Sequence, residues 1–249
     1  LSSALVPSLQ QTAHKGSMGR VGVIGGCAEY SGAPYYAALS GLKVGADLSW
    51  VLCSEKASVP IKSYTPELMV TPFYADDMLD RFPRGSDEYA QLVQGYAQSA
   101  SASLPRMQAL VVGPGLGRHP LVLDAVALVL ASARSRNMPI VVDADGLWLV
   151  TQNLATVRGY GRCILTPNRV EFDRLVEAVT ADLRLGSDDY SGASSGVSTS
   201  TSTNGGDPGV RSMGGLGGTV YAVVEKGSPR RCGGQGDILA GALGVVYNW

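Results

Sequence analysis

Short runs of β-branched and other apolar residues recur along the first part of the chain. They read "RVGVIGG", "LSWVLC", "LMVTPF", "ALVVGPG", "PIVVDAD" and "CILTPN", and they begin at Arg20, Leu48, Leu68, Ala109, Pro139 and Cys163. Unbroken apolar runs of this length are typical of strands buried on both faces, as in parallel sheets. Segments with helical periodicity separate most of them, for example residues 33–46 and 120–136. The alternation predicts an α/β layered fold, with a mostly parallel central sheet flanked by helices.

Glycine and aspartate follow several of these runs. Gly25 and Gly26 end the first apolar run, and three glycines within residues 113–117 follow the fourth run. Asp143 and Asp145 end the fifth run. Ligands of such sheets bind beyond the carboxyl ends of the strands, so we expect the functional site there. The two aspartates could order metal-bound water or simply end the strand, and the sequence leaves the metal ligands open.

One stretch of the chain shows neither the apolar runs typical of strands nor the periodicity typical of helices. Residues 185–218 consist mostly of Ser, Gly and Thr. Such a composition cannot bury enough apolar surface to offset the entropy of ordering, so we expect a flexible insertion in a single domain spanning residues 1–249.

Charge and cysteine content narrow the class of protein. The formal net charge of the 249-residue chain is −1, so we expect no nucleic-acid or membrane partner. The four cysteines have no metal-type spacing, which favours reduced thiols in a cytosol-like compartment. The first residues show no signal-peptide pattern, and we expect a cytoplasmic or mitochondrial protein. The chain does not begin with Met, so we expect a fragment, and a homo-oligomer stays open.

The segment "CGGQGD" precedes an apolar stretch, "ILAGALGVVYNW", that we expect to form a helix packed closely on the sheet. A glycine loop leading into a helix N-terminus favours a bound anion. Asp237 would then lie beside a bound phosphate as a catalytic base, or would merely cap the helix. The spacing alone does not decide between the two roles.

Taken together, the motifs resemble those of the NAD(P)H-hydrate dehydratases of the ribokinase-like superfamily. They occur in order as "VGVIGGCAEYSGAPYY", "IKSYTPELMV", "VVGPGLGR", "PIVVDADGLWLV", "TPNRVEFDRL" and "RRCGGQGDILAGALGV". The form "CGGQGD" looks like the ATP-dependent eukaryotic branch. The resemblance implies that ATP, with Mg²⁺, phosphorylates the hydroxyl of the S form of NADH or NADPH hydrate. Phosphate then leaves and the reduced ring is restored.

The resemblance also implies roles for particular residues. Asp237 matches the catalytic aspartate and contacts the substrate. The matching nucleotide-binding residues are Lys226, Gly227, Ser228, Pro229, Arg230, Arg231, Cys232, Gly233, Gly234, Gln235 and Gly236. The matching substrate-binding residues are Gly115, Gly117, Asn168, Arg169, Val170, Glu171, Phe172, Asp173 and Arg174. Asn168 and Glu171 also have the spacing of a capping box, and Tyr30, Ser31 and Gly32 are placed to border the nicotinamide ring.

The chain departs from the family pattern near its end. Lys226 and Gly227 run directly into the arginine–glycine loop, so one strand pair and an aspartate are expected to be missing, as are further C-terminal helices. Both departures fall on the nucleotide side, and we expect weaker binding of ATP than of the dinucleotide. Two alternatives remain open: a ribokinase-like small-molecule kinase, and a non-catalytic nucleotide-binding fragment of the dehydratase.

Overall fold

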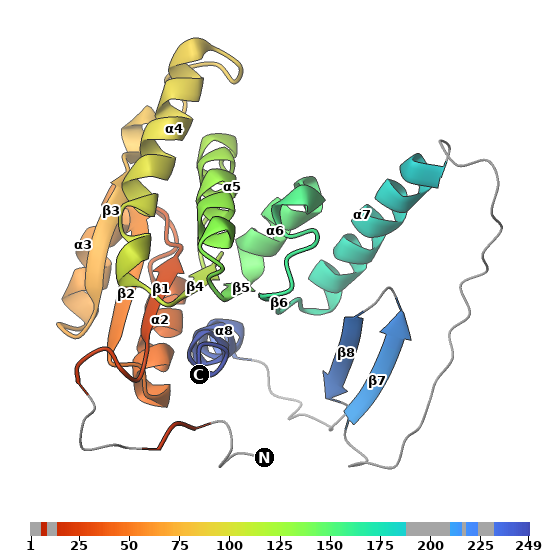
Figure 1. The fold of residues 1–249 in the computed structure, drawn as a ribbon. Helices are drawn as coiled ribbons and strands as arrows, with labels where there is room; N and C mark the ends of the chain where they lie inside the picture. Colours follow the sequence, from red (N-terminus) through yellow and green to blue (C-terminus); the bar gives the residue numbers. More distant parts are fainter. Residues whose placement is uncertain (1–5, 9–13, 188–209, 216–217, 224–231) are drawn as a thin grey trace. The chain divides into compact units, whose positions relative to one another are not determined.

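A computed structural model describes residues 6–8, 14–187, 210–215, 218–223 and 232–249 (Figure 1). The chain divides into two compact units. The first comprises Leu1–Ala181 with Gly233–Trp249, and the second comprises Asp182–Cys232. The predicted insertion lies in the second unit, and its flexibility and the single-domain organisation stay predictions.

All six predicted strands are present, and they form one sheet. They are β1 (Arg20–Ile24), β2 (Leu48–Ser54), β3 (Met69–Tyr74), β4 (Ala109–Val112), β5 (Ile140–Val142) and β6 (Cys163–Leu165). Their order is β3-β2-β1-β4-β5-β6, and every pairing is parallel. The ribokinase-like prediction of a mostly parallel sheet is therefore confirmed. Because the strands run the same way, their carboxyl ends share one edge.

Helices connect the strands. They are α2 (Gly32–Val44), α3 (Glu55–Tyr64), α4 (Asp87–Ser101), α5 (Pro120–Ser135), α6 (Ala144–Gln152), α7 (Arg169–Ser187) and α8 (Gln235–Val246), with short 3₁₀ turns at Asp76–Met78, Leu104–Arg106 and Leu154–Thr156. Side-chain caps fix several starts: Ser54 Oγ accepts from Ala57 N, and Ser86 Oγ accepts from Tyr89 N. Such caps satisfy backbone N–H groups that the first helical turn leaves unpaired.

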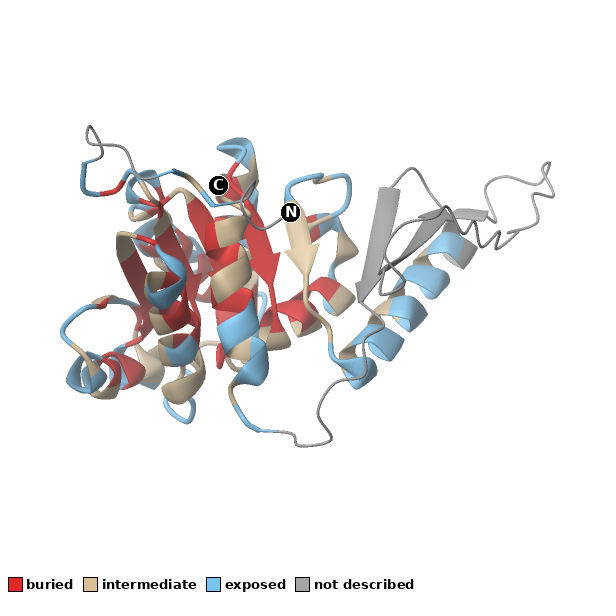
Figure 2. Cartoon of the chain, turned by 90° about the horizontal axis from the view of Figure 1, so that it is seen from below, coloured by how far each residue is buried: buried red, intermediate tan, exposed pale blue. Residues whose placement is uncertain are grey.

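Two apolar layers cover the sheet (Figure 2). On one face, Val21, Val23 and Val111 pack with residues of α2, α3 and α8. On the other face, Ile24 and Val112 pack with residues of α4, α5 and α6. Burial on both faces is the reason that the strands have continuous rather than alternating apolar sequences.

Helix α8 packs closely because it carries glycine at its contacts. A Cβ atom added to Gly241 would overlap the carbonyl oxygen of Ala37 on α2, and one added to Gly244 would lie 2.8 Å from Val111 Cγ2 on β4. Ser40 Oγ also donates to the carbonyl of Ile238 at 3.0 Å. The close packing predicted for this segment is confirmed within the first unit.

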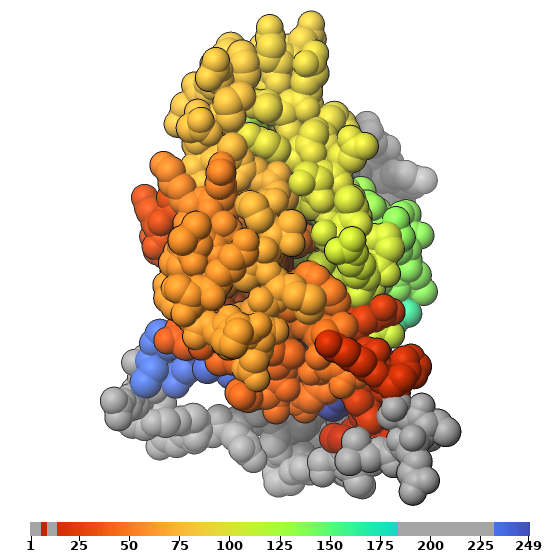
Figure 3. Space-filling model, turned by 90° about the vertical axis from the view of Figure 1, so that its left-hand side faces the viewer, coloured from red at the N-terminus to blue at the C-terminus, as the bar shows by residue number. Residues whose placement is uncertain are grey.

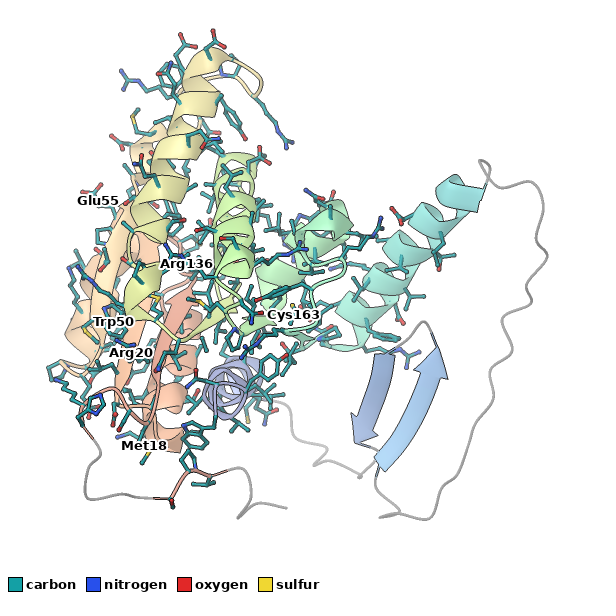
Figure 4. All side chains as sticks on the ribbon, viewed as in Figure 1. Met18, Arg20, Trp50, Glu55, Arg136 and Cys163 are labelled. Atoms are coloured by element: carbon teal, nitrogen blue, oxygen red, sulfur yellow. The ribbon has the colours of Figure 1, made fainter. Side chains whose placement is uncertain are left out.

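The edge strands of the sheet, β3 and β6, are both incompletely buried. Figure 3 faces the β3 side, where segments from the first half of the chain (orange to yellow) form the surface. Figure 4 labels Trp50 on β2 and Cys163 on β6, the opposite edge strand. The residues of β6 are only partly buried.

The second unit contains an antiparallel pair of strands, β7 (Val210–Gly215) and β8 (Gly218–Val223). Strand β7 lies inside the range that the composition assigned to an insertion, and the sequence analysis did not predict it. The Ser- and Gly-rich composition hid the strand because neither residue type has a strong strand preference. Both strands precede Lys226, so the expected loss of a strand pair after Lys226 falls on residues outside the described ones and stays a prediction.

Candidate active site

Two loops meet at the carboxyl edge of the sheet, one after β1 and one after β4. The N–H of Gly26 lies 3.1 Å from the carbonyl of Pro114 and 3.0 Å from that of Gly115, which joins the loop after β1 to the loop after β4. A Cβ atom added to Gly115 would lie 2.9 Å from Tyr30 Cβ. Two segments expected to border the substrate, at Tyr30 and at Gly115, therefore lie against each other.

Asp145 holds the second half of the glycine loop. Its carboxylate accepts hydrogen bonds from Gly117 N at 3.0 Å and from Arg118 Nε at 2.8 Å. Gly115 and Gly117 both have positive φ values, 61° and 77°, a region that glycine enters at low cost. Asp145 therefore positions the loop through both oxygens, and a role in ordering metal-bound water stays a prediction.

Asp143, in contrast, is buried beneath the loops, with 5% of its surface exposed. Thr166 Oγ1, after β6, donates to its Oδ1 at 2.8 Å. Burial raises the pKa of the carboxyl above its ordinary value, while the Thr166 hydrogen bond and the N–H of Ala144 lower it. The other oxygen, Oδ2, would lie 3.8 Å from a Cβ atom added to Gly236. Asp143 therefore faces the first turn of α8.

Asp237 is the third residue of α8. The N-cap is Gly234, with φ 84°, and no side chain caps this helix. Among the described residues, the structure gives the Asp237 carboxylate no hydrogen-bond partner. Burial first, and then the negative charge of Asp143, raises its pKa from 3.8 to about 6. Asp237 thus makes no capping hydrogen bond among the described residues, and an unpaired, half-buried carboxylate of raised pKa suits a general base. The catalytic role stays a prediction.

The capping box at the start of α7 is confirmed. Asn168 Oδ1 accepts from Val170 N at 2.9 Å and from Glu171 N at 3.1 Å, while Glu171 Oε2 accepts from Asn168 N at 2.9 Å. Further along this segment, the Arg174 guanidinium lies 5.9 Å from the Trp148 ring centre on α6. Asn168, Arg169, Val170, Phe172, Asp173 and Arg174 are exposed and Glu171 is partly buried, and their contact with substrate stays a prediction.

The predicted nucleotide-binding stretch is only partly described. Residues 226–231, including Arg230 and Arg231, lie outside the described residues. Gly234 precedes α8 with its backbone in the left-handed region, and Gln235 and Gly236 form the first turn with Asp237. Four N–H groups at such a helix start have no partner within the helix, and the helix dipole favours an anion there. This part of the stretch is suited to a phosphate group.

The sequence analysis missed Arg118, Trp148 and Thr166. Thr166 is brought to Asp143 only by the pairing of β5 with β6. Arg118 directly follows the glycine loop, and its position in "GPGLGR" was the one available signal. Its guanidinium lies 4.7 Å from the Trp148 ring centre.

Solved structures share the fold of this chain. A ribokinase-like superfamily protein from Enterococcus faecalis matches 98% of this chain and 78% of its own, with a TM-score of 0.63 and 22% identity. A Bacillus subtilis ADP/ATP-dependent NAD(P)H-hydrate dehydratase, co-crystallised with ATP/Mg²⁺, matches 98% and 82% with a TM-score of 0.51 and 20% identity. At these identities the likeness concerns the fold, which is ribokinase-like.

The particular family follows from sequence. The family model described as NAD(P)H-hydrate dehydratase matches residues 21–249. The chain is 46% identical to the ATP-dependent (S)-NAD(P)H-hydrate dehydratase of Bos taurus, covering 100% of this chain and 70% of the relative. It is 45% identical to the enzyme of that name from Homo sapiens, covering 98% and 66%. The chain belongs to the NAD(P)H-hydrate dehydratase family, and it spans about two thirds of the length of these relatives.

Proposed function

We propose that this chain dehydrates the S forms of NADH hydrate and NADPH hydrate at the expense of ATP, which would repair damaged nicotinamide cofactors. The observation that carries the proposal is the Asp237 carboxylate, which is unpaired among the described residues and lies in the first turn of α8, at the sheet edge where the glycine loops meet. Family membership supplies the substrate class.

The phosphoryl transfer needs a proton acceptor beside the hydroxyl of the hydrate. Asp237 takes the proton of the hydrate's hydroxyl as that oxygen attacks the γ-phosphorus of ATP, and ADP leaves. The C–O bond of the phosphate ester then breaks, its electrons leave with phosphate, and the departing phosphate takes a proton from the neighbouring ring carbon, so the ring double bond returns. Phosphate is a far better leaving group than hydroxide, which is why ATP is consumed. The N–H groups at the start of α8 stabilise the charge on the transferred phosphoryl group.

Magnesium fits the residues present without a dedicated site. No group of three or more His, Cys, Asp or Glu gathers for a metal among the residues that the structure describes. Mg²⁺ usually takes most of its ligands from phosphates and water and needs one or two carboxylates. Asp143 and Glu171 would meet this need, since a carboxylate has more acceptor sites than the hydrogen bonds from Thr166 Oγ1 and Asn168 N occupy. Bound with ATP, the ion would neutralise phosphate charge.

Asp237→Asn tests the assignment. We expect turnover to fall by at least ~10²-fold, the usual contribution of a positioned general base, while ATP still binds because Asn preserves the shape of the first turn. The measurement is ATP-dependent recovery of the near-ultraviolet absorbance of the reduced ring from purified hydrate. Turnover within a few-fold of the parent would overturn the role. Consumption of ATP with small alcohols but not with hydrate would favour the ribokinase-like kinase, and binding without any turnover would favour the non-catalytic fragment.

The proposal also covers the compartment, the oligomeric state and the partners of the protein. No helix of the described residues is long and apolar enough to cross a membrane. Cytoplasmic or mitochondrial residence, homo-oligomerisation and the absence of a nucleic-acid or membrane partner remain expectations from charge, cysteine content and family. Fractionation of cells and light scattering of the purified chain test them.

A further inference from the structure

Two arginines share one indole beside the predicted substrate loops. The guanidinium carbon of Arg118 lies 4.7 Å from the ring centre of Trp148, and that of Arg174 lies 5.9 Å from it. Trp148 belongs to α6, Arg118 follows the glycine loop after β4, and Arg174 belongs to α7. Contact with an aromatic face restricts the orientation of a guanidinium group, so less conformational entropy is lost when the group binds a ligand.

Other contacts orient the first arginine further. Asp145 accepts from Arg118 Nε and from Gly117 N, which ties this guanidinium to the substrate loop. The terminal nitrogens of Arg118, and the whole guanidinium of Arg174, have no acceptor within the described residues. Asp145 and Trp148 hold Arg118, which keeps 49% of its side chain exposed. Arg174 is exposed and lies 5.9 Å from the Trp148 ring centre.

A small pocket lies between these groups. Its lining includes Arg118, Leu147, Trp148, Thr151, Glu171 and Arg174. Glu171 is the one acid in the lining, and its Oε2 already accepts the N–H of Asn168. The pocket itself is too small for a phosphate group. The exposed N–H donors of the two arginines beside it suit a ligand that offers several anionic oxygens, and the guanidinium fork matches phosphate geometry.

We propose that Arg118 and Arg174 bind a phosphate group of the dinucleotide substrate and that Trp148 positions both guanidinium groups for it. The proposal rests on the proposed function for its substrate, and it adds Arg118 and Trp148 to the substrate-binding residues. The phosphate is either part of the diphosphate bridge, common to both hydrates, or the 2′-phosphate found only in NADPH hydrate. Binding energy gained here is the same in ground and transition states, so it lowers KM without raising kcat.

Arg118→Gln and Arg174→Gln test the contact, with Arg84→Gln as the matched control. Arg84 pairs with Asp124 at 3.0 Å and lies outside this pocket. Losing a charged hydrogen bond should raise the KM for hydrate by about tenfold or more in each pocket variant, with kcat and the KM for ATP nearly unchanged. The control should leave all three constants unchanged. A rise for both hydrates identifies the diphosphate, and a rise for NADPH hydrate alone identifies the 2′-phosphate.

Two substitutions of Trp148 test whether its aromatic ring, and not only its volume, positions the arginines. Trp148→Phe retains a ring for stacking and should keep the KM for hydrate within a few-fold of the parent. Trp148→Leu retains an apolar filler but no ring face, and should raise this KM as the arginine variants do. Equal KM values for Phe and Leu would show that Trp148 only fills space, contrary to the proposal.

Direct binding separates this proposal from the proposed function. Calorimetric titration with NADPH and NADH, which need not react, should give affinities that fall with salt in the parent and are lower in Arg118→Gln and Arg174→Gln. If the parent lacks turnover but binds dinucleotide more tightly than Arg118→Gln and Arg174→Gln do, the proposed function fails and the phosphate contact stands. Unchanged KM and unchanged dinucleotide affinity in both arginine variants, or a rise in the KM for ATP alone, would overturn the contact.

Discussion

Asp237 is an acid placed where its charged form is costly. It lies in the first turn of α8, half-buried, with Asp143 nearby and no partner among the described residues. A folded-state pKa of about 6, against 3.8 ordinarily, means that the folded chain binds more protons than the unfolded chain between these values. The free energy of unfolding therefore falls as pH rises through this window.

Replacing the charge should therefore stabilise the free protein. Without nucleotide or metal, we expect Asp237→Asn to unfold about 2–4 °C above the parent at neutral pH, the scale of one kcal/mol for a chain of this size. The difference should shrink near pH 4, where the parent carboxyl is largely protonated when folded. Thermal unfolding across this range measures it. A gain that is equal at both pH values would point to a cause other than ionisation.

The elements at the site are fixed by local hydrogen bonds as well as by packing. At the start of α7, Asn168 both caps the helix and lies in the segment predicted to contact substrate. Asn168→Ala should cost about 1 kcal/mol of local stability, seen as faster amide exchange in the first turn of α7. Asn168→Ser should restore most of the protection, because Ser also caps helices.

Comparing the two variants separates the capping role of Asn168 from its predicted contact with substrate. A KM for hydrate that stays raised in Asn168→Ser, with exchange restored, isolates a substrate contact of the amide. Unchanged exchange in Asn168→Ala would mean that the cap contributes little to α7.

Close approach of α8 to α2 holds Asp237 at the sheet edge. Gly241 has no room for a methyl group, since the added Cβ would overlap the Ala37 carbonyl oxygen. Gly241→Ala should therefore lower the free energy of unfolding by about 1–3 kcal/mol, the usual cost of overpacking, and reduce turnover as α8 shifts.

A helical glycine elsewhere provides the control for Gly241→Ala. Gly95, within α4, has nothing within 4 Å of an added Cβ. Gly95→Ala should stabilise the chain by about 0.5–1 kcal/mol, because alanine loses less backbone entropy on folding. Chemical denaturation compares the two variants. Equal effects of both substitutions would argue against tight packing at Gly241.

At the scale of the whole molecule, the two compact units make separate predictions possible. The first unit contains the parallel sheet, both apolar layers and Asp237. Deleting residues 189–208 keeps the pairing of β7 with β8 and shortens only a Ser- and Gly-rich connection. Loop closure entropy changes by about 0.6 kcal/mol for each doubling of length, so we expect the midpoint of thermal unfolding to move by less than about 3 °C.

Limited proteolysis adds an independent measurement of the same segment. The composition of residues 189–208 predicts that the first cuts fall there. Resistance to protease, or a large loss of stability on deletion, would show that this connection packs against the rest of the chain.

The sequence by itself determined the elements and their chemistry. Strands buried on both faces have continuous apolar runs, and caps such as Asn168 with Glu171 depend on residues three apart, so both are readable locally. The positions of the glycines likewise predicted the loops at the site and the close packing of α8. The motifs and their order along the chain indicated the protein family. Strand β7 was missed because Ser and Gly carry little local signal for a strand.

Only the tertiary structure decided which side chains meet. Asp143 and Asp145 are two residues apart at one strand end, and the sequence offered the same two roles for both. The pairing of β5 with β6 brings Thr166 to Asp143, and the packing of α8 places Asp143 opposite Gly236, whereas Asp145 turns to Gly117 and Arg118. Likewise, Trp148 joins Arg118 and Arg174 across three elements. These contacts depend on strand order and helix packing, which join residues far apart in the chain and leave no periodic trace in it.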